Sequence, residues 1–139
     1  MAITVKLVNS EREKEICFFI RREVFIIEQK ISKNIEKNND KILASYFLAK
    51  YKKKYVGTAR YQKTDLGLKL ERFAVLNDYR GLGVGKALVG YILNVIGRDK
   101  KIYLNAQEQV VGFYKKLGFE KIGRRFFEAG VPHFKMILK

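Results

Sequence analysis

The sequence predicts a single α/β domain over residues 1–139, in which helices flank a mixed, mostly antiparallel central sheet of about six to seven strands. Three observations support this prediction. Strand-like segments outnumber helix-like segments and do not alternate strictly with them, as they would in a parallel sheet. A glycine-rich turn lies between a strand-like and a helix-like segment in the middle of the chain. The length of 139 residues suits one domain with a buried core and leaves no room for a second.

The N-terminal region predicts one strand followed by one helix. Apolar and polar residues alternate over residues 3–8, which is the pattern of a strand. Ser10 and Glu13 form a capping box, which predicts the start of a helix. The apolar residues of that helix are Ile16, Phe19, Ile20 and Val24. The polar segment that follows, residues 32–40, suits either a loop or a frayed helix.

The middle of the chain predicts a meander of three antiparallel strands, over residues 42–50, 55–63 and 67–76. The basic run at residues 52–54 is predicted to form the first corner. A turn around Asp65 and Gly67 is predicted to form the second corner.

The C-terminal half predicts two helices and three strands. A helix over residues 83–97 is indicated by three apolar residues at helical spacing, Leu88, Ile92 and Val95. A short strand at 102–104 and a helix at 108–117 follow, and Gly118 is placed to end that helix. The domain closes with two strands, over residues 119–127 and 133–138.

The most informative motif is the turn before the helix at 83–97, which reads Arg80-Gly81-Leu82-Gly83-Val84-Gly85. Its glycines permit backbone conformations that point successive N–H groups into one concavity, and the helix start adds further unpaired N–H groups. The turn therefore predicts a pyrophosphate site, with Arg80 or Lys86 balancing the charge. The alternative is a turn that merely ends a strand.

Three features narrow the kind of ligand. The turn follows three or four strands, whereas a dinucleotide-binding turn follows the first strand. No Gly-Lys-Ser/Thr sequence follows the turn, so a nucleotide triphosphatase would lack its metal ligand. His133 is the only histidine, which argues against a histidine-built metal site, and we predict no metal. A phosphate site without metal or hydride chemistry suits a coenzyme A thioester.

Charge and cysteine content limit the binding partners and the cellular compartment that we expect. The formal net charge of +15 attracts polyanions, but the lysines are spread along the chain rather than gathered with aromatic residues, so nucleic-acid binding is possible but not favoured. Cys17 is the only cysteine and is expected to be a buried core thiol, which suits a reducing compartment. We expect a cytoplasmic protein without a membrane partner, because no basic leader precedes the first strand and the apolar runs are short.

At the glycine turn the chain resembles the GNAT superfamily of acyl-CoA N-acyltransferases. The pyrophosphate loop of that superfamily reads Arg/Gln-x-x-Gly-x-Gly/Ala between the fourth strand and a helix, and Arg80, Gly83 and Gly85 match it. The approach to the loop, residues 75–80, is similar to the usual Val-Leu-Pro-Glu-Tyr-Arg, with Asn77 in place of proline.

Other segments resemble the ElaA-like branch of this superfamily. The family pattern near the C-terminus consists of an Asn, then a Phe-Tyr pair and a Gly-Phe pair. This chain has Phe113-Tyr114 and Gly118-Phe119 at the two pairs, and Gln107 in place of the Asn. Four further segments are similar to that branch, namely residues 21–29, 70–72, 104–107 and 127–133. Two departures stand out. Residues 31–34, in the acceptor-side loop, replace a Pro and an acidic run, and Ser45 stands where relatives often have histidine, so a role of that histidine is not transferred.

The resemblance implies a GNAT-like fold, acetyl-CoA as the cofactor and an unidentified amine as the acceptor. It implies that N–H groups of Phe73, Ala74 and Val75 pair with the pantetheine arm, one of them serving as the oxyanion donor. A homodimer is compatible with it, since a closing strand can be exchanged between subunits in this superfamily. The other cofactor-binding residues that we expect are Arg80, Gly81, Leu82, Gly83, Val84, Gly85, Lys86, Asn105, Gln107 and Tyr114.

Four residues are candidates for catalysis. Tyr114 is the candidate acid, because a neutral phenol can protonate the departing thiolate; the alternative is an aromatic residue of the core. Glu71, Glu28 and His133 are the candidate bases. Each has a structural alternative: Glu71 as a surface carboxylate or the partner of an arginine, Glu28 as an anchor of the first helix, and His133 as a structural histidine. Arg21 and Arg60 could pair with these two glutamates or with an anionic acceptor, and we expect at least one such pairing within the chain.

The sequence therefore predicts an enzyme that transfers an acetyl group from acetyl-CoA to a primary amine by direct attack on the thioester. One alternative is an acyltransferase with another acyl-CoA or another nucleophile. The other alternative is a non-catalytic or regulatory module that binds CoA or a polyanion such as nucleic acid.

Overall fold

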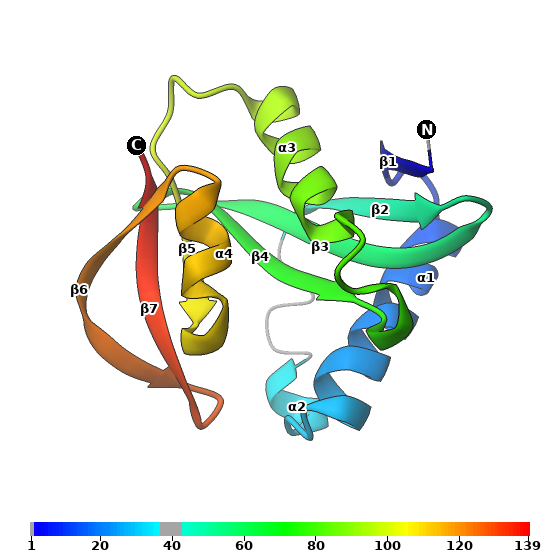
Figure 1. Ribbon diagram of the computed structural model, residues 1–139, viewed down its shortest axis with the longest axis horizontal. Coiled ribbons are helices and arrows are strands. Elements are labelled where there is room, and N and C mark those ends of the chain that lie inside the picture. The colour runs from blue at the N-terminus through cyan, green and yellow to red at the C-terminus, as the bar shows by residue number, and fades with distance from the viewer. Residues whose placement is uncertain (1, 37–42) are drawn as a thin grey trace.

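The computed structural model describes residues 2–36 and 43–139, and it consists of one sheet with helices on both faces (Figure 1). The strand order is β1-β2-β3-β4-β5-β7-β6. All neighbours are antiparallel except β4 and β5, which are parallel. The strands are β1 (Ile3–Leu7), β2 (Ser45–Tyr51), β3 (Lys54–Thr64), β4 (Gly67–Val75), β5 (Ile102–Gln107), β6 (Phe119–Glu128) and β7 (Val131–Leu138). This sheet confirms the predicted fold class.

The helices divide between the two faces of the sheet. The α-helices are α1 (Glu11–Arg21), α2 (Lys33–Glu36), α3 (Val84–Ile96) and α4 (Val111–Lys116); α1 continues as a π-helical segment, η1 (Arg22–Glu28), and two 3-10 turns are η2 (Asn77–Tyr79) and η3 (Glu108–Val110). In Figure 1, α3 and α4 lie in front of the sheet, and α1 lies behind its β2–β3 side. In the described residues, no helix is long and apolar enough to cross a bilayer.

Each face of the sheet has its own apolar core. The core under α3 and α4 includes Leu88, Ile92, Leu104 and Met136, all nearly inaccessible to solvent. The core under α1 and η1 is smaller and consists of Cys17, Ile20, Val24, Phe25, Tyr46, Leu48 and Ala74. Cys17 is fully buried, as predicted, and burial raises the pKa of its thiol to about 11.

The structure corrects several details of the expected elements. Two of the apolar residues that indicate the helices, Phe19 and Val95, are exposed, with exposed fractions of 55% and 47%. On α1 the buried positions are Cys17, Ile20 and Arg21, so Phe19 points away from the sheet. The helix expected at 108–117 is divided into η3 and α4. Within the polar segment at 32–40, residues 33–36 form α2, and residues 37–40 lie outside the described residues. The predicted start of the next strand, residue 42, also lies outside them, and β2 is described from Ser45.

The tight corners of the meander have the chemistry that the sequence predicts. Thr64 Oγ1 accepts a hydrogen bond from the backbone N–H of Leu66 and donates one to the carbonyl of Gly67, which closes the β3–β4 turn. Gly67 has a φ of +134°, and a Cβ there would collide with the backbone carbonyl of Lys101. Glycine is therefore required where the loop before β5 crosses the start of β4.

Candidate coenzyme and acceptor site

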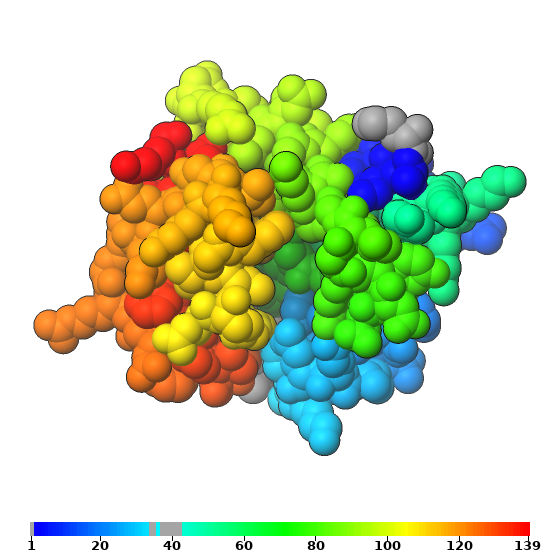
Figure 2. All heavy atoms as spheres, viewed as in Figure 1, coloured from blue at the N-terminus to red at the C-terminus, as the bar shows by residue number. Residues whose placement is uncertain are grey.

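Strands β4 and β5 form a fork. They are paired only from Leu68 to Leu70 on β4, opposite Ile102 to Leu104 on β5, and they diverge beyond that point. The edge of β4 from Arg72 to Val75 is therefore not paired with β5, and the backbone groups on that edge are available to a ligand. In Figure 2 the front face of the molecule is hollowed between the yellow and orange atoms of the β5–α4 region and the green atoms that follow β4.

A bulge in β4 helps to open this fork. The pairs Thr58 with Ala74 and Arg60 with Glu71 leave two β4 residues, Arg72 and Phe73, opposite one residue of β3. Arg72 has a φ of +59°, a left-handed conformation that a residue with a Cβ adopts at a cost. The bulge bends β4 just where the expected pantetheine edge begins, so the strain lies at the candidate site.

The glycine turn leads directly into α3. Gly81 and Gly83 have φ values of +78° and +93°, and Gly83 is the N-cap of α3. Space around a Cβ on Gly81 is open, and both glycines are exposed. Backbone N–H groups of the turn and of the first turn of α3 are therefore open to an anion, with the positive end of the helix dipole behind them.

The other residues of the turn have mixed environments. Leu82 and Lys86 are exposed. The side chain of Val84, the first residue of α3, is buried, so only the backbone of Val84 could contact a ligand. A Cβ on Gly85 would lie 3.2 Å from Cζ of Phe113. Gly85 is thus the place where α3 meets the ring of Phe113 on α4, and this helix contact gives it a structural role.

Gly57 on β3 supports α3 from below, a role that the sequence did not indicate. A Cβ on Gly57 would lie 2.8 Å from Cγ1 of Val84 and 3.3 Å from Cδ1 of Leu88. The absence of a side chain lets the first turns of α3 pack closely on the sheet. The position of the glycine turn therefore depends on a residue 26 positions before Gly83 in the chain.

Arg80 binds protein groups on the β4 and η1 sides of the turn. Its terminal nitrogens contact both carboxylate oxygens of Glu28, at 2.5 and 2.6 Å, and its Nε donates to the carbonyl of Val75 at 2.9 Å. The hydrogen bond and charge of Arg80 lower the pKa of Glu28. The structure thus joins two predicted site residues, and the Arg80 side chain holds the turn against η1.

Tyr114 lies in a cluster of aromatic rings at the fork. Its ring meets those of Phe73, Phe113 and Phe119 edge-on, with centroids 5.9, 5.0 and 5.9 Å away. The contact with Phe73 brings the candidate acid of α4 against the candidate edge of β4. Burial raises the pKa of the Tyr114 phenol, which keeps it protonated at neutral pH.

Glu71 is a buried ion-pair partner. One carboxylate oxygen accepts a hydrogen bond from Arg60 Nε at 2.7 Å and another from Gln62 Nε2 at 2.9 Å, and Lys69 Nζ lies 3.3 Å from the other oxygen. Burial opposes ionisation, but the neighbouring cations outweigh it and hold the pKa of Glu71 below its ordinary value. A general base needs a shift in the opposite direction, so the contacts favour the structural alternative for Glu71.

Arg60 and Arg21 both pair within the chain, as expected for at least one of them. Arg60 is fully buried and also donates to the hydroxyl of Tyr46 at 3.0 Å. Arg21 pairs with Glu36 of α2, at 2.7 Å, and not with Glu28 or Glu71. The role of Glu36 was missed because it lies in a polar segment without helical periodicity.

His133 lies on β7, directly opposite Gln107 of β5. Its Nδ1 is 2.7 Å from the carbonyl oxygen of Val131. Because that oxygen can only accept, Nδ1 carries a proton, and in a neutral imidazole Nε2 is then the accepting atom. Nε2 lies 3.7 Å from a carboxylate oxygen of Glu128, and the imidazole stacks on the ring of Phe126.

Gln107 and Asn105 lie on the face of β5 opposite to Leu104 and Ala106. Gln107 donates to the side chain of Gln29 at 3.0 Å, which links β5 to the end of η1. Asn105 lines a cleft with residues of β6 and β7. Both residues are thus on the side of the sheet that carries α1 and η1, whereas Tyr114 is on the side of α3 and α4.

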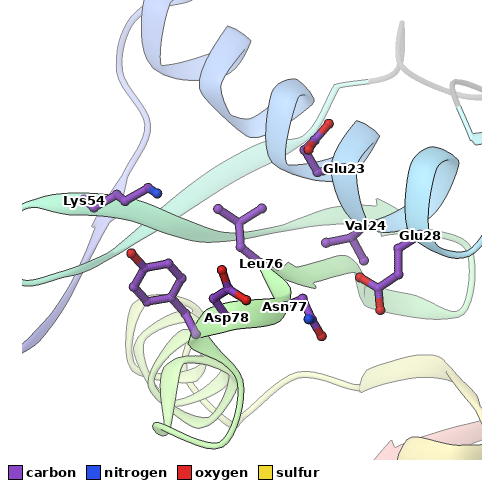
Figure 3. Close-up of a pocket in the computed structure, with 8 residues that line it drawn as sticks. Glu23, Val24, Glu28, Lys54, Leu76, Asn77 and Asp78 are labelled. Atoms are coloured by element: carbon purple, nitrogen blue, oxygen red, sulfur yellow. The ribbon is translucent and has the colours of Figure 1, made fainter.

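The larger cleft lies between η1 and the chain that follows β4 (Figure 3). Its volume is about 420 Å³, and its lining includes the carboxylates Glu23, Glu28 and Asp78 but only one cation, Lys54. Figure 3 shows the Glu23 and Glu28 side chains on the η1 wall and Asn77 and Asp78 across from them. This cleft is unsuited to a pyrophosphate, which leaves the glycine turn as the better anion site.

Comparisons with known proteins agree with this arrangement. A family model described as an acetyltransferase (GNAT) domain matches residues 8–139. The uncharacterized N-acetyltransferase YjcF of Bacillus subtilis is 31% identical over 134 residues, which cover 94% of this chain and 96% of that protein. The crystal structure of Escherichia coli ElaA is 26% identical, with 99% of each chain covered and a TM-score of 0.86. A GNAT family acetyltransferase from Elizabethkingia anophelis, solved with acetyl-CoA bound, is 17% identical, with 98% of this chain and 95% of that chain covered and a TM-score of 0.67.

Proposed function

The chain belongs to the GNAT acetyltransferase family, and from this premise we propose that it transfers an acetyl group from acetyl-CoA to a primary amine. The observation that carries the proposal is the fork between β4 and β5, where the glycine turn, the β4 edge and Tyr114 meet. The family supports acyl-CoA N-acyltransferase activity. The acetyl donor and the primary amine are our proposal.

The residues at the fork fit a coenzyme A thioester. The open backbone of Gly81 and Gly83 at the start of α3 suits the pyrophosphate, with Lys86 exposed nearby in the sequence. The N–H groups of Phe73 to Val75 suit the amide groups of the pantetheine arm. A structural relative with acetyl-CoA bound supports the choice of cofactor. Acetyl-CoA supplies an activated acyl group, and a reducing compartment such as the cytoplasm suits a chain whose one cysteine is a buried free thiol.

The chemistry requires three functions from the protein. When the amine nitrogen attacks the thioester carbonyl carbon, the carbon–sulfur bond breaks and the thiolate takes a proton from the Tyr114 hydroxyl. A backbone N–H of the β4 edge stabilises the oxyanion that forms on the way. A buried phenol is a suitable donor, because its proton is retained until negative charge develops on sulfur.

We propose His133 as the base that takes the proton from the amine. Its Nδ1–H donates a hydrogen bond to the Val131 carbonyl, so Nε2 of the neutral imidazole is the atom that can accept a proton. His133 is paired with Gln107 of β5, near the fork. Glu71 and Glu28 are ionised partners of Arg60 and Arg80 and are less suited to the role. Replacement of His133 by Ala should lower kcat, and added imidazole should restore part of it; a variant with full activity would remove His133 from the mechanism.

Calorimetric titration with acetyl-CoA tests the proposed cofactor site directly. The wild type should bind one molecule of acetyl-CoA. The Gly83→Val variant should lose this binding, because the φ of +93° is strained for a β-branched residue. The Gly90→Ala variant is the matched control, since Gly90 lies on the exposed side of α3 with open space around a Cβ. Absence of binding by the wild type would reject the proposed function.

A further inference from the structure

A second cleft lies over the end of the sheet that α1 does not cover. Its volume is about 380 Å³, and it is lined by Asn105, Ile122, Gly123, Arg124, Phe126 and Lys135. Lys135 is paired with both Asn105 and Ile122 across the strands, so these three side chains lie on one face of the sheet. This is the face opposite to Tyr114.

A bulge in β6 shapes this cleft. The β6–β7 pairing shifts between Ile122 and Phe126, which leaves residues 123–125 opposite a single residue of β7. Gly123 has a φ of +75° within the bulge. Arg124, within the bulge, lines the cleft together with Ile122 and Phe126.

The cleft is positively charged. Its lining has two cations, Arg124 and Lys135, and no carboxylate. In the described part of the chain, neither cation has a carboxylate within ion-pair distance. The nearby acids Glu108 and Glu120 pair with Arg125 and Lys139, and a carboxylate oxygen of Glu128 lies 3.7 Å from Nε2 of His133. Lys135 rests on the ring of Tyr103, at 5.6 Å from its centroid, which holds the ammonium on this face.

A buried hydrogen-bond acceptor lies in the same cleft. The side-chain oxygen Oδ1 of Asn105 is buried and accepts no hydrogen bond from the described residues. Leaving such an atom without a donor costs free energy, so a ligand N–H that reaches it would be favoured. Ile122 and Phe126 add apolar surface to the lining of the cleft.

The position of Asn105 connects the cleft with the reaction. The last β5 residue paired with β4 is Leu104, so Asn105 is the first residue of β5 beyond the fork point. An amine held beside Asn105 would approach the fork from the face opposite to α3 and α4. Cofactor and acceptor would then reach the fork from opposite faces of the sheet.

We propose that this cleft binds the acceptor, and that the acceptor is a primary amine that also carries a carboxylate, such as an apolar α-amino acid. The inference rests on the proposed function, since it names the substrate class for that reaction. The amine donates to Oδ1 of Asn105, the carboxylate pairs with Lys135 and Arg124, and the apolar side chain packs on Ile122 and Phe126. Asn105 is thereby assigned to the acceptor instead of the cofactor.

The test compares amines with and without a carboxylate. L-Leucine and L-phenylalanine are each paired with their amides, and acetyl transfer is followed by release of free CoA thiol and by the mass of the product. We expect kcat/KM to be at least about tenfold higher for the amino acids, which corresponds to one charge-assisted contact. In the Arg124→Gln/Lys135→Gln double variant this preference should disappear through a higher KM for the amino acid, with an unchanged KM for acetyl-CoA.

Lys121→Gln is the matched control, because Lys121 lies on the same hairpin but is paired with Met136, on the other face of the sheet. This variant should keep the full preference, and thermal melting should show that all variants are folded. Equal rates for acids and amides, faster amides, or a preference that survives in the double variant would each overturn the inference. Failure to bind acetyl-CoA would instead reject the proposed function together with the inference that rests on it.

Discussion

Glu28 and Arg80 lie 52 positions apart in the chain and form a two-point ion pair, with both carboxylate oxygens bound to the guanidinium. The same guanidinium holds the carbonyl of Val75 and lies 3.4 Å from the side-chain oxygen of Asn77. Arg80 therefore ties the glycine turn to the end of β4 and to η1. A coenzyme phosphate at the turn would meet a guanidinium that is already neutralised, and the backbone N–H groups would be its main partners.

Removal of Arg80 should loosen the turn. We expect Arg80→Ala to weaken acetyl-CoA binding about tenfold, which corresponds to ~1.4 kcal/mol, and Glu28→Gln to weaken it only about two- to threefold, because an amide keeps one of the two hydrogen bonds. Calorimetric titration measures both effects. Arg98→Ala, beyond the other end of α3, removes the same charge from an exposed position and should bind normally. Tighter binding by Glu28→Gln would show that Glu28 competes with the phosphates for Arg80.

The hydroxyl of Tyr114 should matter for the chemical step alone. Tyr114→Phe keeps the ring contacts with Phe73, Phe113 and Phe119, so we expect kcat to fall about 100-fold with an unchanged KM for acetyl-CoA. Since burial raises the pKa of this phenol, the wild-type rate should not decline through loss of its proton up to about pH 10, the ordinary phenol value. Tyr91→Phe, on α3, is the control. A Tyr114→Phe variant with normal kcat would contradict the assignment.

Gly57→Ala should disturb α3 from beneath. The added methyl would lie 2.8 Å from Val84 Cγ1, in a buried and stiff side chain, and we expect a loss of about 1–3 kcal/mol in the free energy of unfolding together with weaker acetyl-CoA binding. Gly90→Ala makes the same change on the exposed side of α3 and should stabilise the protein by about 0.5–1 kcal/mol. Urea denaturation and calorimetry measure the two effects. Equal stability of the two variants would mean that the sheet yields at Gly57 without strain.

Glu71 should contribute to stability in a pH-dependent way. Its folded pKa is lowered, so its contribution is complete above the unfolded value, ordinarily 4.5, and is lost as the pH falls through the folded value. At about pH 7, Glu71→Gln should cost about 3 kcal/mol or more, because it removes the carboxylate that accepts a hydrogen bond from the buried Arg60 guanidinium. Urea denaturation from about pH 7 to about pH 3 should show the gap to wild type narrowing below about pH 4. Glu120→Gln, in an exposed ion pair, is the control; a gap that stays constant throughout would exclude this ion-pair contribution.

Much of the fold could be predicted from the sequence because its elements have clear local patterns. Alternation and helical spacing indicate the meander and α3, and Ser10 caps α1 as the capping box predicts. The side on which each helix packs was harder to predict. Phe19 is larger and more apolar than Cys17, yet Cys17 is buried and Phe19 is exposed, because the orientation of α1 on the sheet decides which face is covered.

The candidate site was only partly predictable, because many of its contacts join residues that are far apart in the sequence. The glycine turn has its own residue signature, but the pairing of Glu28 with Arg80 and of Arg60 with Glu71 depends on how the elements pack. The left-handed position in the β4 bulge is occupied by Arg72 and not by a glycine, so the sequence does not indicate the bulge. The cleft around Asn105 combines three strands, β5, β6 and β7, and no local pattern in any one of them indicates a pocket.

The short parallel pairing between β4 and β5 divides the sheet into two parts that are each continuous in the chain. Strands β1 to β4, with α1 and α3, come entirely before the loop at residues 97–101, and β5 to β7, with α4, come entirely after it. Only three residue pairs join the two parts of the sheet. A chain cut in that loop would yield two pieces with a common edge, so the protein is suited to fragment complementation, with a ligand at the fork contacting both fragments and strengthening their association.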